Sequence, residues 1–187
     1  MAIYFTSDTH FGSQRTLELS KRPFTSVEEM DRVMIDNWNS VVGKDDIVYH
    51  LGDFGNYDII KQLNGKVRLI YGNYETEDLK NRPSLLDELK ELGFDCQYPF
   101  DDMYIQKCVI DVDGYEICMA HKPTSVIHEN AKDKIHLFGH IHKLQMVKKR
   151  GLNVGVDCHN FTPIDLDTVL FYHNAIQKYY DKDVFCE

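Results

Sequence analysis

The chain is best understood from one stretch, Ile135-His136-Leu137-Phe138-Gly139-His140-Ile141-His142. Its first four residues form a short apolar run, which predicts a buried strand, and Gly139 predicts a turn where that strand ends. His140 and His142 lie one residue apart, so in extended backbone their side chains would project to the same side. Imidazole suits zinc, iron, manganese or nickel. The stretch predicts either a metal site or two polar loop residues, and the surrounding sequence decides between them.

Length and composition indicate a single globular domain over residues 1–187, large enough for a substantial core. The hydrophobic content of 43% and the charged content of 27% are ordinary for a soluble protein. The net charge of −9 argues against a general nucleic-acid binder, which needs a basic face, so long nucleic acid is not expected as a partner. A site for one phosphate ester stays open, because bound cations can reverse the local field.

The cysteines and the apolar runs favour a cytoplasmic protein. There are five cysteines without Cys-x-x-Cys spacing, a pattern typical of free thiols in a reducing compartment. No run approaches the roughly 18 apolar residues that span a membrane. The first eight residues also lack the basic flank and apolar region of a signal peptide. The sequence does not indicate the oligomeric state.

Strands and helices are predicted to alternate in the first half of the chain, which is the α/β pattern. Strands are expected over residues 3–7, 46–51 and 67–71, and helices over 26–42 and 57–63. Ser26 and Glu29 form a capping-box pattern for the first of these helices. Residues 11–24 are expected to form a loop, and residues 77–92 to become helical only from Ser84, after Pro83.

The second half of the chain is predicted to add strands and one final helix. Strands are expected over residues 94–98, 103–111, 115–120 and 152–156, with an Asp113-Gly114 hairpin turn. The final helix is expected over residues 165–180, after Thr162-Pro163.

Nitrogen and oxygen donors stand at or directly after these predicted strands. The set is Asp8, His10, Asp53, Asn73, His121, His140 and His142. Ligands collect at the carboxyl ends of strands in such folds. Seven donors are too many for one tetrahedral zinc ion, but they suit two divalent cations about 3.5–4 Å apart that share a bridging carboxylate. The four imidazoles fit Mn²⁺ best, with Fe, Zn²⁺ and Ni²⁺ as further candidates, and disfavour Mg²⁺.

The order of these motifs resembles that of the calcineurin-like metallophosphoesterases. The matching motifs are Asp8-x-His10, Gly52-Asp53, Gly72-Asn73, His121 and Gly139-His140-x-His142, and residues 153–157 are typical of small bacterial and phage members. The resemblance implies a four-layer α/β/β/α sandwich of two mixed sheets flanked by helices. It also implies that one metal is held by Asp8, His10 and His142, and the other by Asn73, His121 and His140. Asp53 would bridge the two metals.

One position departs from the family pattern. The third motif of the family usually has a histidine where this chain has Tyr74, followed by Glu75. A phenol has a pKa near 10, so it is a weaker proton donor than an imidazolium, although it can hydrogen-bond a phosphate oxygen. General acid catalysis is worth about 10²–10⁴-fold. We therefore hypothesise a bias toward phosphodiesters or good leaving groups, with Asp53, Asn73, Tyr74 and His121 as the catalytic positions.

The leading prediction is a hydrolase that cleaves phosphoester bonds through metal-bound hydroxide. A small phosphoester is the expected substrate, with nucleotides and cyclic phosphodiesters open. The alternative is a non-catalytic, metal-binding interaction scaffold of the same fold.

Several further polar residues have two interpretations each. His50 and His159 either orient ligands or play no part in the site, and Asp157 either hydrogen-bonds a ligand histidine or ends a strand. The basic residues either contact phosphate or are solvated; they are Arg15, Arg22, Lys122 and Lys143. The remaining histidines are expected at the surface or as satisfied polar groups; they are His128, His136 and His173.

Overall fold

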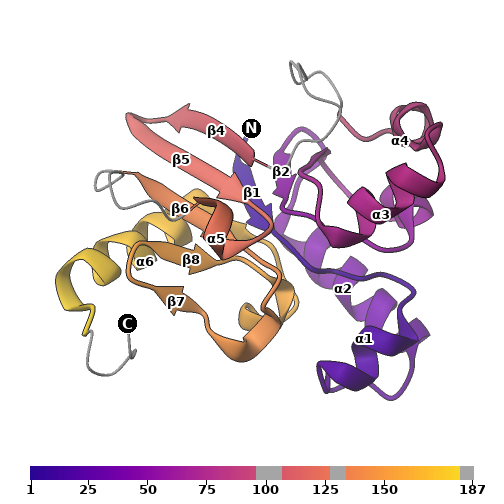
Figure 1. Cartoon of the computed structure of the whole chain (residues 1–187), viewed down its shortest axis with the longest axis horizontal. Helices are drawn as coiled ribbons and strands as arrows, with labels where there is room; N and C mark the ends of the chain where they lie inside the picture. The colour runs from indigo at the N-terminus through magenta and orange to yellow at the C-terminus, as the bar shows by residue number, and fades with distance from the viewer. Residues whose placement is uncertain (96–106, 127–133, 182–187) are drawn as a thin grey trace.

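Two mixed β-sheets face each other between helices in the computed structural model, which describes residues 1–95, 107–126 and 134–181 (Figure 1). The first sheet has the order β3-β2-β1-β9. Its strands are β1 (Ile3–Thr6), β2 (Ile47–His50), β3 (Lys66–Leu69) and β9 (Ile164–Asp165). The strands β1, β2 and β3 are parallel, and β9 is antiparallel to β1.

The second sheet has the order β4-β5-β6-β8-β7. Its strands are β4 (Lys107–Val112), β5 (Tyr115–Ala120), β6 (Ile135–Phe138), β7 (Val147–Lys148) and β8 (Gly151–Asn153). The central strands β5, β6 and β8 are parallel, while β4 and β7 pair antiparallel at the edges. The β4–β5 hairpin turns at Asp113 and Gly114, both with positive φ, as an Asp-Gly turn requires.

Helices cover the sheets on either side (Figure 1). The side of the first sheet carries α1 (Gln14–Leu19), α2 (Val27–Val41), η1 (Tyr57–Gln62), α3 (Asn73–Asn81) and α4 (Leu85–Leu92). The long helix α6 (Leu166–Tyr179) lies on the other side, against β8, β9 and β1. Short helical turns occur at α5 (Pro123–Val126), η2 (His142–Leu144) and η3 (Val156–Cys158).

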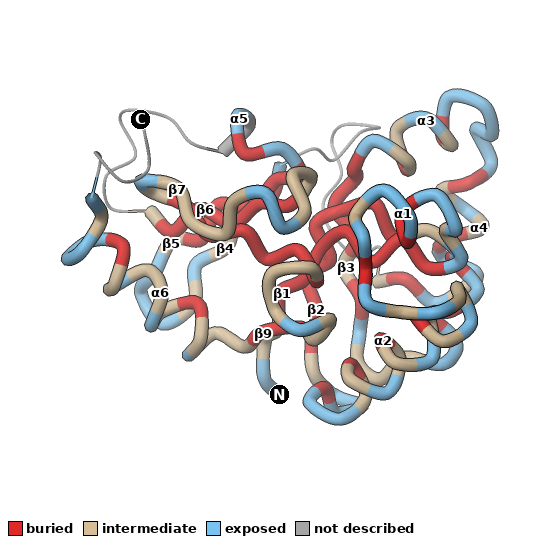
Figure 2. The backbone as a smooth tube through the Cα atoms, turned by 90° about the horizontal axis from the view of Figure 1, so that it is seen from below, coloured by how far each residue is buried: buried red, intermediate tan, exposed pale blue. Residues whose placement is uncertain are grey.

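The alternation of side chains along β2 explains the two main cores. Val48 points to the helices and packs in a cluster with Trp38 of α2. Tyr49 points the other way, into a cluster with Leu137 of β6. Successive strand residues face opposite sides of a sheet, so one four-residue strand supplies both layers of packing. The buried trace in Figure 2 accordingly runs through the strands, with exposed residues on the outer helices.

The structure confirms the expected sandwich of two mixed sheets flanked by helices, with each predicted strand of residues 3–7, 46–51, 67–71 and 115–120 in place. Ser26 caps α2 as predicted, through a bond from the Glu29 N–H to its Oγ. Strand 103–111 is observed as β4 from Lys107, and its earlier residues lie outside the described part of the chain. Of the strand predicted at 94–98, only residues 94 and 95 are described, and neither is in a strand.

Two predictions about local structure were wrong. Residues 11–24 contain α1, which begins where Ser13 Oγ accepts the Thr16 N–H. Residues 73–81 already form α3, so the chain is helical before Pro83 as well as after it. The final helix is in place as predicted, since α6 begins directly after its Asp165 cap, and residues 164 and 165 also form the short strand β9. Among the described residues, no helix is long and apolar enough to cross a membrane.

Candidate metal centre

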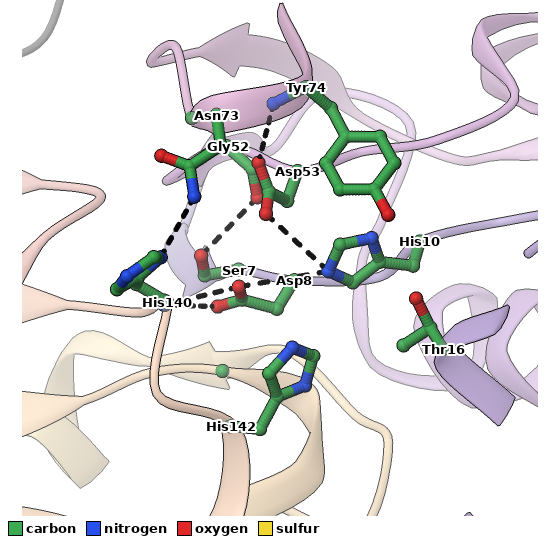
Figure 3. Close-up of polar contacts among 12 residues, drawn as sticks. Ser7, Asp8, His10, Thr16, Gly52, Asp53, Asn73, Tyr74, His140 and His142 are labelled. Carbon is green, nitrogen blue, oxygen red and sulfur yellow. Dashed lines mark hydrogen bonds and ion pairs between the residues drawn. The ribbon is translucent and has the colours of Figure 1, made fainter. Parts of the chain in front are cut away.

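Loops that follow strands of both sheets meet at one place (Figure 3). The loops after β1, β2 and β3 come from parallel strands of the first sheet, and those after β5 and β6 from parallel strands of the second. Within each sheet the loops are hydrogen-bonded: the Asp8 N–H donates to Gly52 O at 3.0 Å, and the Gly139 N–H to His121 O at 2.9 Å. Between the sheets, the His140 N–H donates to Asp8 Oδ2 at 2.9 Å. Each predicted ligand is on one of these loops or, for Asn73 and His142, is the first residue of the helix or helical turn that follows the loop.

Asp53 lies between the two halves of the site. Its Oδ2 is 3.5 Å from Nε2 of His10 and also 3.5 Å from Nε2 of His121. Its Oδ1 accepts the Tyr74 N–H at 3.0 Å. Burial raises the pKa of Asp53. A buried carboxylate oxygen placed between two imidazole nitrogens is the arrangement expected of a group that bridges two cations.

Asp8, His10 and His142 have ligand atoms within 4.8 Å of one another, and so do Asp8, Asp53 and His121. His10 is 3% exposed, yet neither ring nitrogen has a hydrogen-bond partner in the described structure. Burial, with His142 adding to it, lowers the pKa of His10 to about 2, so this imidazole is neutral. Buried polar groups are normally satisfied. The unpartnered imidazole beside two carboxylates therefore fits a cation held by this set.

The second half of the site consists of Asn73, His121 and His140. His121 Nδ1 is 2.9 Å from Leu51 O, and since a carbonyl only accepts, Nδ1 carries the proton. Its Nε2 lies 3.1 Å from His140 Nδ1. Asn73 Nδ2 lies 3.2 Å from the same His140 atom. The side chains of Asn73 and His121 thus both lie within hydrogen-bond distance of His140 Nδ1.

The backbone at the candidate ligands is left-handed. Nine non-glycine residues have positive φ in the described part of the chain, and five of them are candidate ligands. These five are Asp8 (58°), His10 (49°), Asp53 (57°), His140 (71°) and His142 (48°). Such conformations are uncommon for residues other than glycine and cluster at functional sites. The expectation that His140 and His142 sit in extended backbone was therefore wrong: they point into different halves of the site.

Gly139 lets the two sheets approach each other at this point. A Cβ on Gly139 would overlap Ser7 Oγ and Asp8 Oδ2. Any larger residue would push the β6 loop away from Asp8 and break the bond from the His140 N–H. The glycine that was read as a turn signal is thus required for close approach.

A buried ion pair holds the first half of the site from behind. The Arg22 guanidinium donates from Nε and Nη2 to Asp157, at 3.0 and 2.9 Å, and to the carbonyls of Asp8 and Thr9. Asp157 Oδ2 is also 2.8 Å from His142 Nδ1, and the bonds to His142 and Arg22 lower the pKa of Asp157 to about 2. The pair fixes the ring of His142, so that Nε2 is the nitrogen that can bind a metal ion. Asp157 thus bonds the histidine, and Arg22 is a buried structural residue, which corrects its interpretation as a phosphate contact.

Glu75 ties the loop after β2 to the loop after β3. Its side chain is fully buried, and its oxygens accept the N–H groups of Asp53, Phe54 and Gly72, each at 2.8 Å. Burial, with the charge of Asp53 adding to it, raises the pKa of Glu75. No role for Glu75 was predicted, and neither was the ion pair of Arg22 with Asp157. Glu75 could have been found from its place in the third motif, whereas the partners Arg22 and Asp157 are 135 residues apart, and no local pattern joins them.

His50 and His159 both bond to backbone near the ligands. The Gly52 N–H donates to His50 Nδ1 at 3.2 Å, so Nε2 carries the proton and donates to Thr9 Oγ1 at 2.9 Å. His50 therefore joins the loops that carry Asp8 and Asp53, and its burial lowers its pKa to about 3. His159 Nε2 bonds the carbonyl of Asn153 at 2.7 Å, and the Asn153 amide donates to the carbonyl of His142.

Comparison with known proteins agrees with this geometry. The calcineurin-like phosphoesterase superfamily domain matches residues 1–170. The chain belongs to this superfamily. It is 30% identical to the uncharacterized protein MJ1445 of Methanocaldococcus jannaschii over 183 residues, 90% of this chain and 89% of that protein. It is also 38% identical to the gene 66 protein of Mycobacterium phage L5 over 88 residues, 42% of each chain.

A solved structure of this calcineurin-like fold gives the same architecture. The protein of unknown function AQ665 from Aquifex aeolicus superposes with a TM-score of 0.65 over 91% of this chain and 98% of that one, at 24% identity. At this identity the likeness shows the fold alone. The family resemblance drawn from the motifs is confirmed by the match of residues 1–170 to the superfamily domain.

The other predicted polar residues have varied surroundings. Arg15 Nη1 donates to the hydroxyl of Tyr74 at 3.3 Å, at the mouth of the site. Lys143 donates to the carbonyl of Lys21. His136 is buried in β6, and His173 is half-buried on α6. His128 lies outside the described residues.

Proposed function

We propose that this calcineurin-like protein is a dinuclear metal-dependent phosphoesterase. The position of Asp53 Oδ2, 3.5 Å from the nearest imidazole nitrogen of each ligand group, is the observation that supports two ions rather than one. Asp8, His10 and His142 would hold one ion, Asn73, His121 and His140 the other, and Asp53 would bridge them. Mn²⁺ suits this donor set best, with Fe, Zn²⁺ and Ni²⁺ as further candidates. When bound, such a pair polarises the phosphoryl group and supplies a nucleophilic water near neutral pH.

The side chains around the metal ligands would orient the substrate rather than transfer a proton to its leaving group. The Tyr74 ring stands edge-on to His10, with 4.8 Å between ring centroids, and its hydroxyl accepts a bond from Arg15. That bond uses the phenol oxygen as an acceptor and leaves its O–H free to donate to a phosphate oxygen. Tyr74 would orient the ester but would protonate a leaving alkoxide poorly. A small phosphodiester, or an ester with a good leaving group, is therefore the substrate class we propose.

We further propose that the enzyme acts in the cytoplasm and on small esters rather than long nucleic acid. Among the described residues, Cys118 and Cys158 are free thiols, as in a reducing compartment. The net charge of −9 opposes binding along a phosphate backbone.

Hydrolysis of two p-nitrophenyl esters tests the activity. Protein stripped of metal and reloaded with Mn²⁺ should hydrolyse bis-p-nitrophenyl phosphate faster than p-nitrophenyl phosphate, and Asp53→Asn should abolish both. Two bound ions per chain without turnover of either ester would contradict the proposal.

The substitution Tyr74→His tests the substrate bias. Because a general acid is worth about 10²–10⁴-fold, we expect at least a roughly tenfold gain in kcat on glycerol 2-phosphate and little gain on the aryl diester. Tyr74→Phe is the matched control, because it removes the hydroxyl without adding a proton donor. An unchanged ratio between the two substrates would show that position 74 does not set the bias.

A further inference from the structure

A polar cleft opens beside the candidate metal centre, on the side of Asn73 and His121. Its volume is about 550 Å³, within the range of roughly 300–1,000 Å³ typical of small-molecule sites. One wall is a face of α3, where residues three and four apart lie side by side. Beyond Asn73 this face carries Thr76, Glu77, Lys80 and Asn81. The cleft is therefore continuous with the site and extends away from it along the helix.

Two lysines make this cleft locally positive. Lys80 on α3 and Lys122, directly after β5, both line it. Within the described residues neither ammonium is in an ion pair, and Glu77 is the one carboxylate in the lining. In a chain of net charge −9, two unpaired lysines beside the site are suited to an anion.

The remaining lining is suited to hydroxyl groups. Thr76, Glu77 and Asn81 offer a hydroxyl, a carboxylate and an amide, which together donate and accept hydrogen bonds. Thr76 Oγ1 donates to Gly72 O at 2.7 Å, so its oxygen is left as an acceptor. The aromatic rings in the described lining are those of Tyr71, which is only 6% exposed, and His121, which is 3% exposed. The cleft therefore offers little ring surface on which a nucleobase could stack.

We propose that this cleft binds the alcohol part of the substrate, and that this part is a small hydroxylated group with a second anionic substituent held by Lys80 and Lys122. A sugar that carries a second phosphate has this chemistry. The proposal rests on the proposed phosphoesterase function, since it places the scissile phosphate at the metal centre. It names the substrate class that the site would select.

Calorimetric titration tests the cleft without relying on turnover. The full-length Mn²⁺-loaded protein would be titrated with fructose 1,6-bisphosphate and with fructose 6-phosphate. We expect the bisphosphate to bind at least about tenfold more tightly, which corresponds to roughly 1.4 kcal/mol. Lys80→Ala and Lys122→Ala should each remove most of that preference. Lys44→Ala is the matched control, because Lys44 lies before β2, at the opposite end of that strand from Asp53.

Three results would overturn the proposal: equal affinity for the two sugar phosphates, equal losses in the Lys44→Ala control, or much tighter binding of adenosine 3′,5′-bisphosphate than of the sugar bisphosphate. The two proposals also fail separately. Lysine-dependent binding without hydrolysis of any ester would support the cleft and contradict the phosphoesterase function. Hydrolysis of bis-p-nitrophenyl phosphate without a preference for the bisphosphate would support that function and contradict the cleft.

Discussion

Single residues at the site adopt backbone conformations that L-amino acids normally avoid. A left-handed residue costs roughly 1–2 kcal/mol, and five candidate ligands adopt this conformation. Glycine would relieve the steric strain at each position, but it has no ligand atom. The chain therefore keeps ligand side chains at positions where glycine would make the metal-free fold more stable.

His140 provides a direct test of this conflict. In metal-free protein, we expect His140→Gly to be more stable to urea than His140→Ala by about 1 kcal/mol, because alanine keeps the Cβ that opposes a φ of 71°. Ile141, with φ of −94°, is the matched control, and there glycine should be less stable than alanine. The same order of stability at both positions would show that the backbone at His140 is not strained.

The identities of the candidate ligands could be predicted from the sequence, but the left-handed conformation of their backbone could not. Asp8, Asp53 and His121 each follow a recognisable strand, and strand ends are where ligands gather in this fold class. The left-handed turns depend on how neighbouring loops bond to one another, as when the His140 N–H donates to Asp8. Such contacts join residues 132 apart and leave no periodic signal.

Among the secondary-structure elements, the long and periodic ones were predictable and the short ones were not. The helix α2 has a cap and a repeating apolar face, so its bounds followed from local pattern. The helix α1 has six residues and the strand β9 two, too few for a period to show. The helix α1 depends on tertiary contacts, because an isolated helix of this length is unstable in water. The strand β9 depends on its pairing with β1.

The ion pair of Arg22 and Asp157 anchors the segment between α1 and α2 to η3. Substitution of Asp157 is therefore expected to have a large effect on stability and on metal affinity. Asp157→Asn leaves Arg22 buried and unpaired, which typically costs about 3–5 kcal/mol. It also weakens the bond to His142, and loss of such a partner typically lowers metal affinity about 10–100-fold. Urea unfolding and a Zn²⁺ or Mn²⁺ titration of the metal-free protein measure the two effects.

Asp58→Asn is the matched control for this ion pair. Asp58 pairs with Lys61 at 2.6 Å, but both side chains are mostly exposed, and exposed pairs contribute about 0–1 kcal/mol. Equal destabilisation by the two substitutions would show that burial does not determine the strength of the Arg22 anchor.

The molecule as a whole depends on the cluster in which the two sheets pack against each other. Leu137 of β6 is fully buried there with Tyr49 of β2, whereas Leu144 of η2 is 85% exposed. We expect Leu137→Ala to lower the free energy of unfolding by about 2–5 kcal/mol, and Leu144→Ala to change it by less than about 0.5 kcal/mol. Urea denaturation of both variants checks this, and a cost for Leu144→Ala close to that of Leu137→Ala would place the core elsewhere.

The hydrogen bonds of Glu75 limit which residues position 75 can accept. Its two oxygens accept three backbone N–H groups from two different loops. Glutamine has the same shape, yet its amide nitrogen would face a backbone N–H, donor against donor, whichever way the group is turned. Position 75 therefore tolerates less change than its chemistry alone would suggest. A variant library of this chain should recover acidic residues there even when it is selected only for folding, before any substrate is offered.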